Sequence, residues 1–126
     1  MTTLKLANYL LVMIVMLLAI PVNSADDAFK DSALSWQKQA TDTRAKVLAV
    51  YEELTQIGDK GNADARELID DAVAQLGEGD KKLKTGDEEL AKNEFQTASY
   101  EFNMAWQYYV KAATAGLNAR RILTGQ

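Results

Sequence analysis

Hydrophobic side chains recur along the chain at alternating spacings of four and three residues, the period of a helix that packs along one stripe. The first stripe consists of Phe29, Ala33, Trp36, Ala40, Thr43, Val47, Val50, Leu54 and Ile57. Gly58 follows it and can take the left-handed conformation that closes a helix, while Asn62 is placed to cap the next one. The pattern predicts a first helix over residues 27–57.

The same spacing continues in two further stretches. One carries Ala65, Ile69, Ala72, Leu76, Gly79 and Leu83, and the other carries Ala91, Phe95, Ala98, Phe102, Ala105, Tyr109, Ala112 and Gly116. Gly86 separates them, with lysines just before it and the acids 87–89 just after it. That order of charges suits the end of one helix and the start of the next. We expect helices over residues 63–85 and 87–123, and whether the last one breaks at Gly116 stays open.

No segment beyond residue 25 alternates between polar and apolar residues as a half-buried strand does. Three amphipathic helices joined by short turns predict an all-α protein, a small antiparallel three-helix bundle with coiled-coil-like seams and a left-handed twist. Alanine or glycine recurs on every stripe, so we expect the helices to approach one another closely.

One hairpin of this bundle resembles a tetratricopeptide repeat. Gly79, Gly86, Ala91, Phe95 and Ala98 match the glycine, turn, alanine, aromatic and alanine positions of that family, over residues 72–105. Gln75 and Lys82 stand where the family favours tryptophan and tyrosine, and the unit does not recur along the chain. The resemblance implies a single helix pair of a type often used for protein docking.

The first 25 residues differ from the rest. They contain one cation, Lys5, then an apolar run from Leu10 to Ile20 that ends at Pro21. This layout predicts a signal peptide cleaved near 24/25 or 25/26, and export to the periplasm or another extracytoplasmic compartment, with no membrane attachment afterwards. The alternative is an uncleaved anchor, which needs a longer apolar run of roughly 20 residues.

Composition narrows the functions that the chain can have. It contains no histidine and no cysteine, so the usual ligands of zinc, haem and iron–sulfur clusters are missing, as is the commonest general base. Neighbouring acids such as Glu52 and Glu53 point about 100° apart on a helix and do not converge on one ion. A formal net charge of −4 disfavours nucleic acid as a partner. We expect no enzyme activity, no cofactor and no metal.

The segment 94–112, EFQTASYEFNMAWQYYVKA, holds six of the ten aromatic residues. At 100° per residue, Phe95, Phe102, Trp106 and Tyr109 fall on the stripe predicted to form the core. Tyr100, Met104 and Tyr108 form a second row on another side, flanked by Thr97 and Lys111. Tyrosine and methionine are common in protein interfaces, so the sequence predicts a partner-binding row there. Burial of the row within the fold, or no role at all, are the alternatives.

Together these features predict an exported, non-enzymatic helical protein. We expect it to bind a larger protein as an accessory subunit, adaptor or assembly factor of an extracytoplasmic complex. One alternative is a self-assembling structural protein, that is, a homo-oligomer. Another is a holdase-like chaperone or a carrier of a small apolar ligand.

Overall fold

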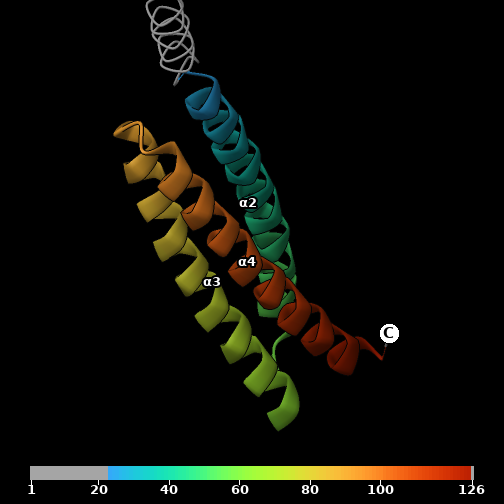
Figure 1. Ribbon diagram of the computed structural model, residues 1–126. Coiled ribbons are helices and arrows are strands. Elements are labelled where there is room, and N and C mark those ends of the chain that lie inside the picture. The colour runs from blue at the N-terminus through green and yellow to red at the C-terminus, as the bar shows by residue number, and fades with distance from the viewer. Residues whose placement is uncertain (1–22, 126) are drawn as a thin grey trace, which may run out of the picture.

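The computed structural model describes residues 23–125 and consists of three long helices, α2 (Asn23–Ile57), α3 (Ala63–Ala91) and α4 (Phe95–Thr124) (Figure 1). No strand occurs among these residues, so the predicted all-α bundle is confirmed. Most of the predicted signal peptide, residues 1–22, lies outside the described part, and α2 already begins at Asn23. None of the three described helices carries a stretch apolar enough to cross a membrane.

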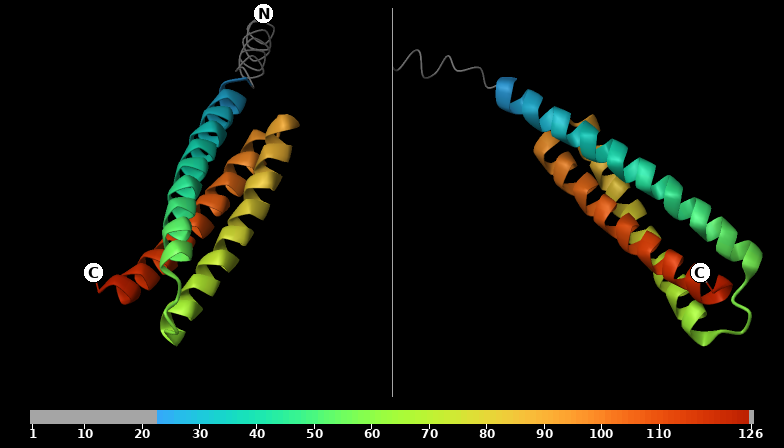
Figure 2. Two further views of the ribbon diagram at one scale, coloured as in Figure 1. Left: turned by 180° about the vertical axis from the view of Figure 1, so that it is seen from behind. Right: turned by 90° about the vertical axis from the view of Figure 1, so that its right-hand side faces the viewer.

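α4 is the central helix of the bundle, because α2 and α3 both pack along it and barely touch each other (Figures 1 and 2). α2 and α4 run parallel and in register: the contacts Ser32–Ser99 and Glu53–Arg120 both join residues 67 apart. α3 runs antiparallel to both: Gly79 and Gly86 meet Tyr109 and Phe102 of α4, and Asp80 and Asp87 meet Arg44 and Gln37 of α2, so positions rise along α3 as they fall along its neighbours. The chain therefore goes up, down and up, with its last helix in the middle.

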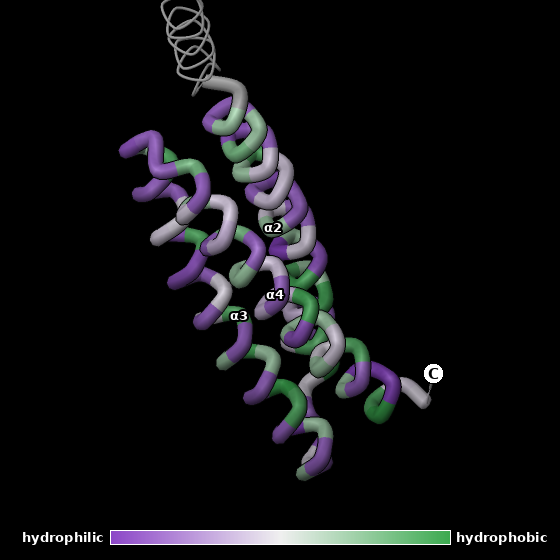
Figure 3. The backbone as a smooth tube through the Cα atoms, in the orientation of Figure 1, coloured by the Kyte–Doolittle hydropathy of each residue, from purple (hydrophilic) through white to green (hydrophobic). Residues whose placement is uncertain are grey.

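A row of alanines explains how α4 approaches two helices at once. Ala98, Ala105, Ala112 and Ala119 lie seven residues apart and are almost completely buried. Larger side chains of α2 and α3, such as Val47, Leu54 and Leu83, pack against α4 in three successive clusters. Hydrophobic and hydrophilic residues alternate along all three helices as this packing requires (Figure 3). These clusters draw only on α2, α3 and α4, so the described bundle contains its own core.

Two glycines of α3 receive the two fully buried aromatic side chains of α4. A Cβ atom added at Gly79 would lie 2.5 Å from the ring of Tyr109, and one added at Gly86 would lie 2.5 Å from the ring of Phe102. Both rings are fully buried. The prediction that Gly86 ends the second helix is therefore wrong: it lies inside α3, and its missing side chain makes room for Phe102.

The reversal between α3 and α4 lies at residues 92–94 instead. Asn93 has a φ of 60°, its N–H donates to the carbonyl of Leu90, and the N–H of Glu94 donates to the carbonyl of Glu89 at 2.9 Å. These two bonds with a left-handed asparagine form a Schellman closure. The predicted helix bounds 63–85 and 87–123 are accordingly replaced by Ala63–Ala91 and Phe95–Thr124. The α3–α4 hairpin exists. The resemblance to a tetratricopeptide repeat implied that Gly86 lies at its turn, but Gly86 lies inside α3.

The order of charges around Gly86 was also misinterpreted, because the lysines before it and the acids 87–89 after it all lie inside α3. Two other predicted helix signals agree with the structure. Gly58 has a φ of 71°, and the side chain of Asn62 accepts a hydrogen bond from the N–H of Ala65 at 2.9 Å. Both close the turn between α2 and α3. α4 continues without a break through Gly116, which packs against the side chain of Val50.

Candidate protein-docking surface

The outward side of α4 is nearly free of charge. Glu101 and Lys111 are the only charged residues between positions 95 and 119, whereas acids and lysines follow one another along α2 and α3. Of the predicted partner-binding row, Thr97, Tyr100 and Lys111 are exposed, and Met104 and Tyr108 are half-buried. All five therefore remain at least partly accessible on the folded bundle.

Two members of this row, Tyr100 and Met104, line a shallow groove between α2 and α4 of about 340 Å³. The other lining residues are Phe29, Ser32, Trp36, Gln96, Ser99, Asn103 and Gln107. None of them is charged. Tyr100 is 61% exposed, more than any other large hydrophobic side chain that the structure describes. The groove is thus an uncharged surface of aromatic, amide and hydroxyl groups with one prominent tyrosine.

The parallel, in-register packing of α2 and α4 builds the floor of this groove. The hydroxyls of Ser32 and Ser99 are hydrogen-bonded at 2.8 Å, and the rings of Trp36 and Trp106 lie 5.3 Å apart, tilted by 51°. The close approach follows from Ala33 and Ala98, both completely buried beside these contacts. The contacts of Ser32 with Ser99 and of Trp36 with Trp106 thus form within the bundle itself, and preorganisation of this kind lowers the entropic cost of binding.

Sequence reasoning missed Phe29 and Trp36 as surface residues. Both were predicted on the core stripe of the first helix, yet Phe29 is 39% exposed and Trp36 is half-buried at the groove. The first turns of α2 lie at the end of the bundle, where residues 25–31 are all exposed. The hydrophobic spacing carries no signal of this, because it does not say where along one helix its neighbours end.

Tyr108 lies apart from the groove. It follows Glu101 by two helical turns, and the carboxylate of Glu101 lies 3.4 Å from the Nζ atom of Lys82 on α3, with only 13% of the Glu101 side chain exposed. Tyr108 is therefore on the α3 side of α4, where Lys111 lies over its ring at 5.2 Å from the centroid. The row predicted as continuous is divided between two sides of the helix.

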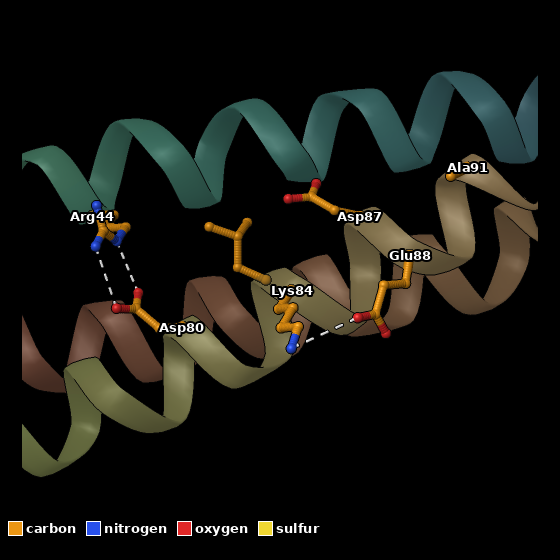
Figure 4. A pocket seen from close by; sticks show the side chains of 7 residues that line it. Arg44, Asp80, Lys84, Asp87, Glu88 and Ala91 are labelled. Atoms are coloured by element: carbon orange, nitrogen blue, oxygen red, sulfur yellow. Dashed lines mark hydrogen bonds and ion pairs between the residues drawn. The ribbon is translucent and has the colours of Figure 1, made fainter.

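A second groove, of about 460 Å³, lies between α2 and α3 (Figure 4). In contrast to the first, its walls carry charged side chains. The Nε of Arg44 donates to Asp80 at 2.8 Å, and Lys84 lies 4.0 Å from Glu88. Asp87 accepts a hydrogen bond from the side chain of Gln37 at 2.9 Å. The Arg44–Asp80 and Gln37–Asp87 contacts hold α2 to α3 where few other contacts do, whereas Lys84 and Glu88 both belong to α3.

Asp80 joins all three helices. It accepts hydrogen bonds from Arg44 of α2 and from the hydroxyl of Tyr109 of α4, at 2.6 Å in the second case. Burial acts to raise the pKa of Asp80, but the bonds from Arg44 and Tyr109 outweigh it and hold that pKa below its ordinary value. Burial and the neighbouring carboxylate raise the pKa of Tyr109 far above its ordinary value. The arrangement stabilises the bundle and presents no group poised for proton transfer.

Among residues 23–125 no group of three or more acidic side chains is placed to hold a metal ion. Comparison with protein-family models, with curated proteins and with solved structures finds no match for this chain. Function is therefore inferred from the residues and their geometry alone.

Proposed function

We propose that the protein is exported and non-enzymatic, and that it binds a larger extracytoplasmic protein as an accessory subunit, adaptor or assembly factor. The docking surface is the outward side of α4 with the groove between α2 and α4. The observation that carries the proposal is the uncharged, aromatic lining of that groove, in a chain of which 25% of the residues are charged.

The chemistry of the groove favours a protein as its ligand. Tyrosine, tryptophan, serine and asparagine dominate the binding loops of antibodies, because rings give large contact areas at low entropic cost and small polar groups adapt their hydrogen bonds. Tyr100, Trp36, Ser99 and Asn103 supply these groups. Depletion of charge is the feature that distinguishes the centre of an interface from the remaining surface.

The dimensions of the bundle favour docking over the transport of a small apolar ligand. Next to Val47, Leu76 and Ala112 the space enclosed between the helices is about 10 Å³. That volume holds at most about one water molecule. The larger space, about 340 Å³, is a shallow groove at the surface. A partner that lies over the surface fits this shape better than a ligand that needs an enclosed cavity.

A photo-crosslinking amino acid at position 100, expressed in the native host, tests the proposal. We expect one discrete adduct of higher mass whose second component is the same extracytoplasmic protein in repeated preparations. The matched control is position 34, because Leu34 is also an exposed hydrophobic residue of the bundle but does not line the groove. Equal adducts at both positions, or none at position 100, would contradict the proposal.

The variant Tyr100→Glu complements that experiment. A carboxylate at the centre of an apolar interface costs several kcal/mol, so we expect the adduct or complex to be lost while the fold is retained. Leu34→Glu places the same charge on α2 outside the groove and should leave the complex intact. A complex that survives Tyr100→Glu places the docking surface elsewhere.

A further inference from the structure

Gly77 lies in the middle of α3, and no packing contact within the described bundle requires a glycine at this position. A Cβ atom added there meets no heavy atom within 4 Å, whereas the same addition at Gly79 or Gly86 collides with an aromatic ring. A glycine inside a helix costs about 0.5–1 kcal/mol relative to alanine. Glycine in a helix often marks a place where another backbone comes close.

Gly77 is at the centre of a row that faces away from α4. Positions spaced by seven residues through it are Ala63, Asp70, Gly77, Lys84 and Ala91, and all five are exposed. They lie opposite the buried row of Ala72, Gly79 and Gly86 that packs on α4. The exposed row has the order alanine, acid, glycine, base, alanine. When a second copy of the row lies beside it in the opposite direction, each acid faces a base and each alanine faces an alanine.

We infer that this row is the interface of an antiparallel two-fold dimer, in which α3 of one copy lies against α3 of a second copy and the axis passes at Gly77. A two-fold interface requires a self-complementary patch, since each residue meets its symmetry mate. Here Gly77 meets Gly77, Asp70 meets Lys84, and Ala63 meets Ala91. This inference goes beyond the proposed function, because it uses a different helix face.

The residues beside the row satisfy the same symmetry. Arg66 and Glu88 are equally far from Gly77 along the chain and are both exposed, so the axis places each opposite the other. Val73, which is 44% exposed, is placed opposite Lys81, whose aliphatic stem covers it. Along the centre of this strip the axis therefore pairs opposite charges at 70/84 and 66/88, alanines at 63/91, and glycine with glycine at 77.

Charge identifies a second copy as the occupant. The chain is acidic, with a formal net charge of −4, so two copies repel each other unless the contacting faces supply both signs. The α3 row does so with Asp70 and Lys84. In the single copy Lys84 lies 4.0 Å from Glu88 with 79% of its side chain exposed, and it is therefore available for a new partner. The dimer also leaves α4 of each copy uncovered, so both inferences can hold together.

A charge-exchange experiment on residues 23–126 tests the dimer, because this part contains its own core. Sedimentation equilibrium at low salt measures the association constant of the wild type, of Asp70→Lys and of Lys84→Asp. One helix pair buries on the order of 1,000 Å², so we expect micromolar association of the wild type. In either single variant two attractive pairs become two repulsive ones, and we expect association to weaken at least about tenfold.

Two rescues separate an ionic interface from a general effect of the substitutions. Asp70→Lys combined with Lys84→Asp in one chain restores the complementarity and should restore the wild-type constant. An equimolar mixture of the two single variants should form a heterodimer although neither variant associates alone. A monomeric wild type at about 100 μM, roughly a hundredfold above the expected constant, overturns the inference. So does a dimer that neither single variant weakens, or a loss that neither rescue reverses.

Gly77→Leu provides a readout that does not depend on charge. A large side chain at the axis holds the two backbones apart, so we expect at least about a tenfold loss of association while the helical content and thermal stability of the single copy remain. Gly77 is exposed and has free space around it, which is why the fold tolerates the change. Unchanged association of this variant contradicts a crossing point at Gly77.

Discussion

The ring of Tyr109 lies directly over Gly79: a methyl group at Gly79 would stand 2.5 Å from the Cε1 atom of the ring. The hydroxyl of the same tyrosine donates a 2.6 Å hydrogen bond to Asp80, the next residue of α3. Tyr109 of α4 thus makes two contacts with α3: its ring fills the space that Gly79 leaves open, and its hydroxyl binds the carboxylate of Asp80. Both contacts must exist together, because the ring reaches Asp80 only if residue 79 leaves room for it.

Gly79→Ala should destabilise the bundle although alanine is the better helix former. The added methyl group forces the buried ring of Tyr109 to move, and overpacking of this kind costs about 1–3 kcal/mol. Thermal unfolding should show a lower midpoint, by about 4–8 °C per kcal/mol for a domain of this size. Gly77→Ala is the control at low protein concentration: with free space around it, it should raise stability by about 0.5–1 kcal/mol. Equal effects of the two changes would contradict the packing of Tyr109.

Acid should weaken the bundle partly through Asp80. Its pKa in the folded protein is lower than the ordinary value of 3.8, so its stabilising contribution is present above that value and is lost as the pH falls through the folded pKa. Asp80→Asn should remove about 1–2 kcal/mol at pH 7 and should flatten the loss of stability below about pH 4. Urea unfolding at several pH values measures both. A parallel pH profile in the variant would show that Asp80 is not responsible.

Tyr109→Phe isolates the hydroxyl from the ring. The ring still packs on Gly79, so we expect a loss of about 1 kcal/mol for the missing hydrogen bond. The pKa of Tyr109 is raised in the folded state, and its contribution is therefore complete below the ordinary value of 10.0 and declines as the pH rises beyond it. The phenylalanine variant should lack that alkaline decline. Denaturant unfolding between pH 8 and 11 compares the two proteins.

Truncation of two aromatic residues of α4 should change the stability of the bundle by very different amounts. Phe102 is fully buried against Gly86, and its replacement by alanine should cost about 3–5 kcal/mol. Tyr100 is largely exposed, so Tyr100→Ala should change stability by no more than about 0.5 kcal/mol. Chemical denaturation measures both. A strong effect of Tyr100→Ala would mean that this side chain supports the fold and is not free for docking.

The helical spacing predicted the three helices and most of their buried residues, because the spacing along one helix decides which residues share a face. The residue types at positions 58 and 62 also predicted the left-handed Gly58 and the cap at Asn62, because both features depend only on nearby residues in the sequence. The position of the second turn could not be predicted in this way. Gly86 has the same local appearance as a helix stop, and only its contact with Phe102, 16 positions away in sequence, shows that it belongs inside α3.

The candidate docking surface was predictable only in part. Angles around one helix separated Tyr100 and Met104 from the buried Phe102 and Tyr109, and the structure agrees. They did not show that Tyr108 turns toward α3, or that Phe29 and Trp36 complete the groove from α2. The placement of Tyr108 depends on how α3 packs on α4, and that of Phe29 and Trp36 on the parallel register of α2 and α4. Both are relations between helices, which the period of a single helix does not encode.

The central position of α4 has a consequence for biosynthesis. Helix α2 and helix α3 bury their apolar stripes against a helix that follows both of them in the chain, and they contact each other too sparsely to form a core without it. Until α4, Phe95–Thr124, has emerged, the earlier helices have no helix to pack onto. Before that point residues 23–91 have no packed core. That is the state in which a polypeptide can be threaded through a narrow channel.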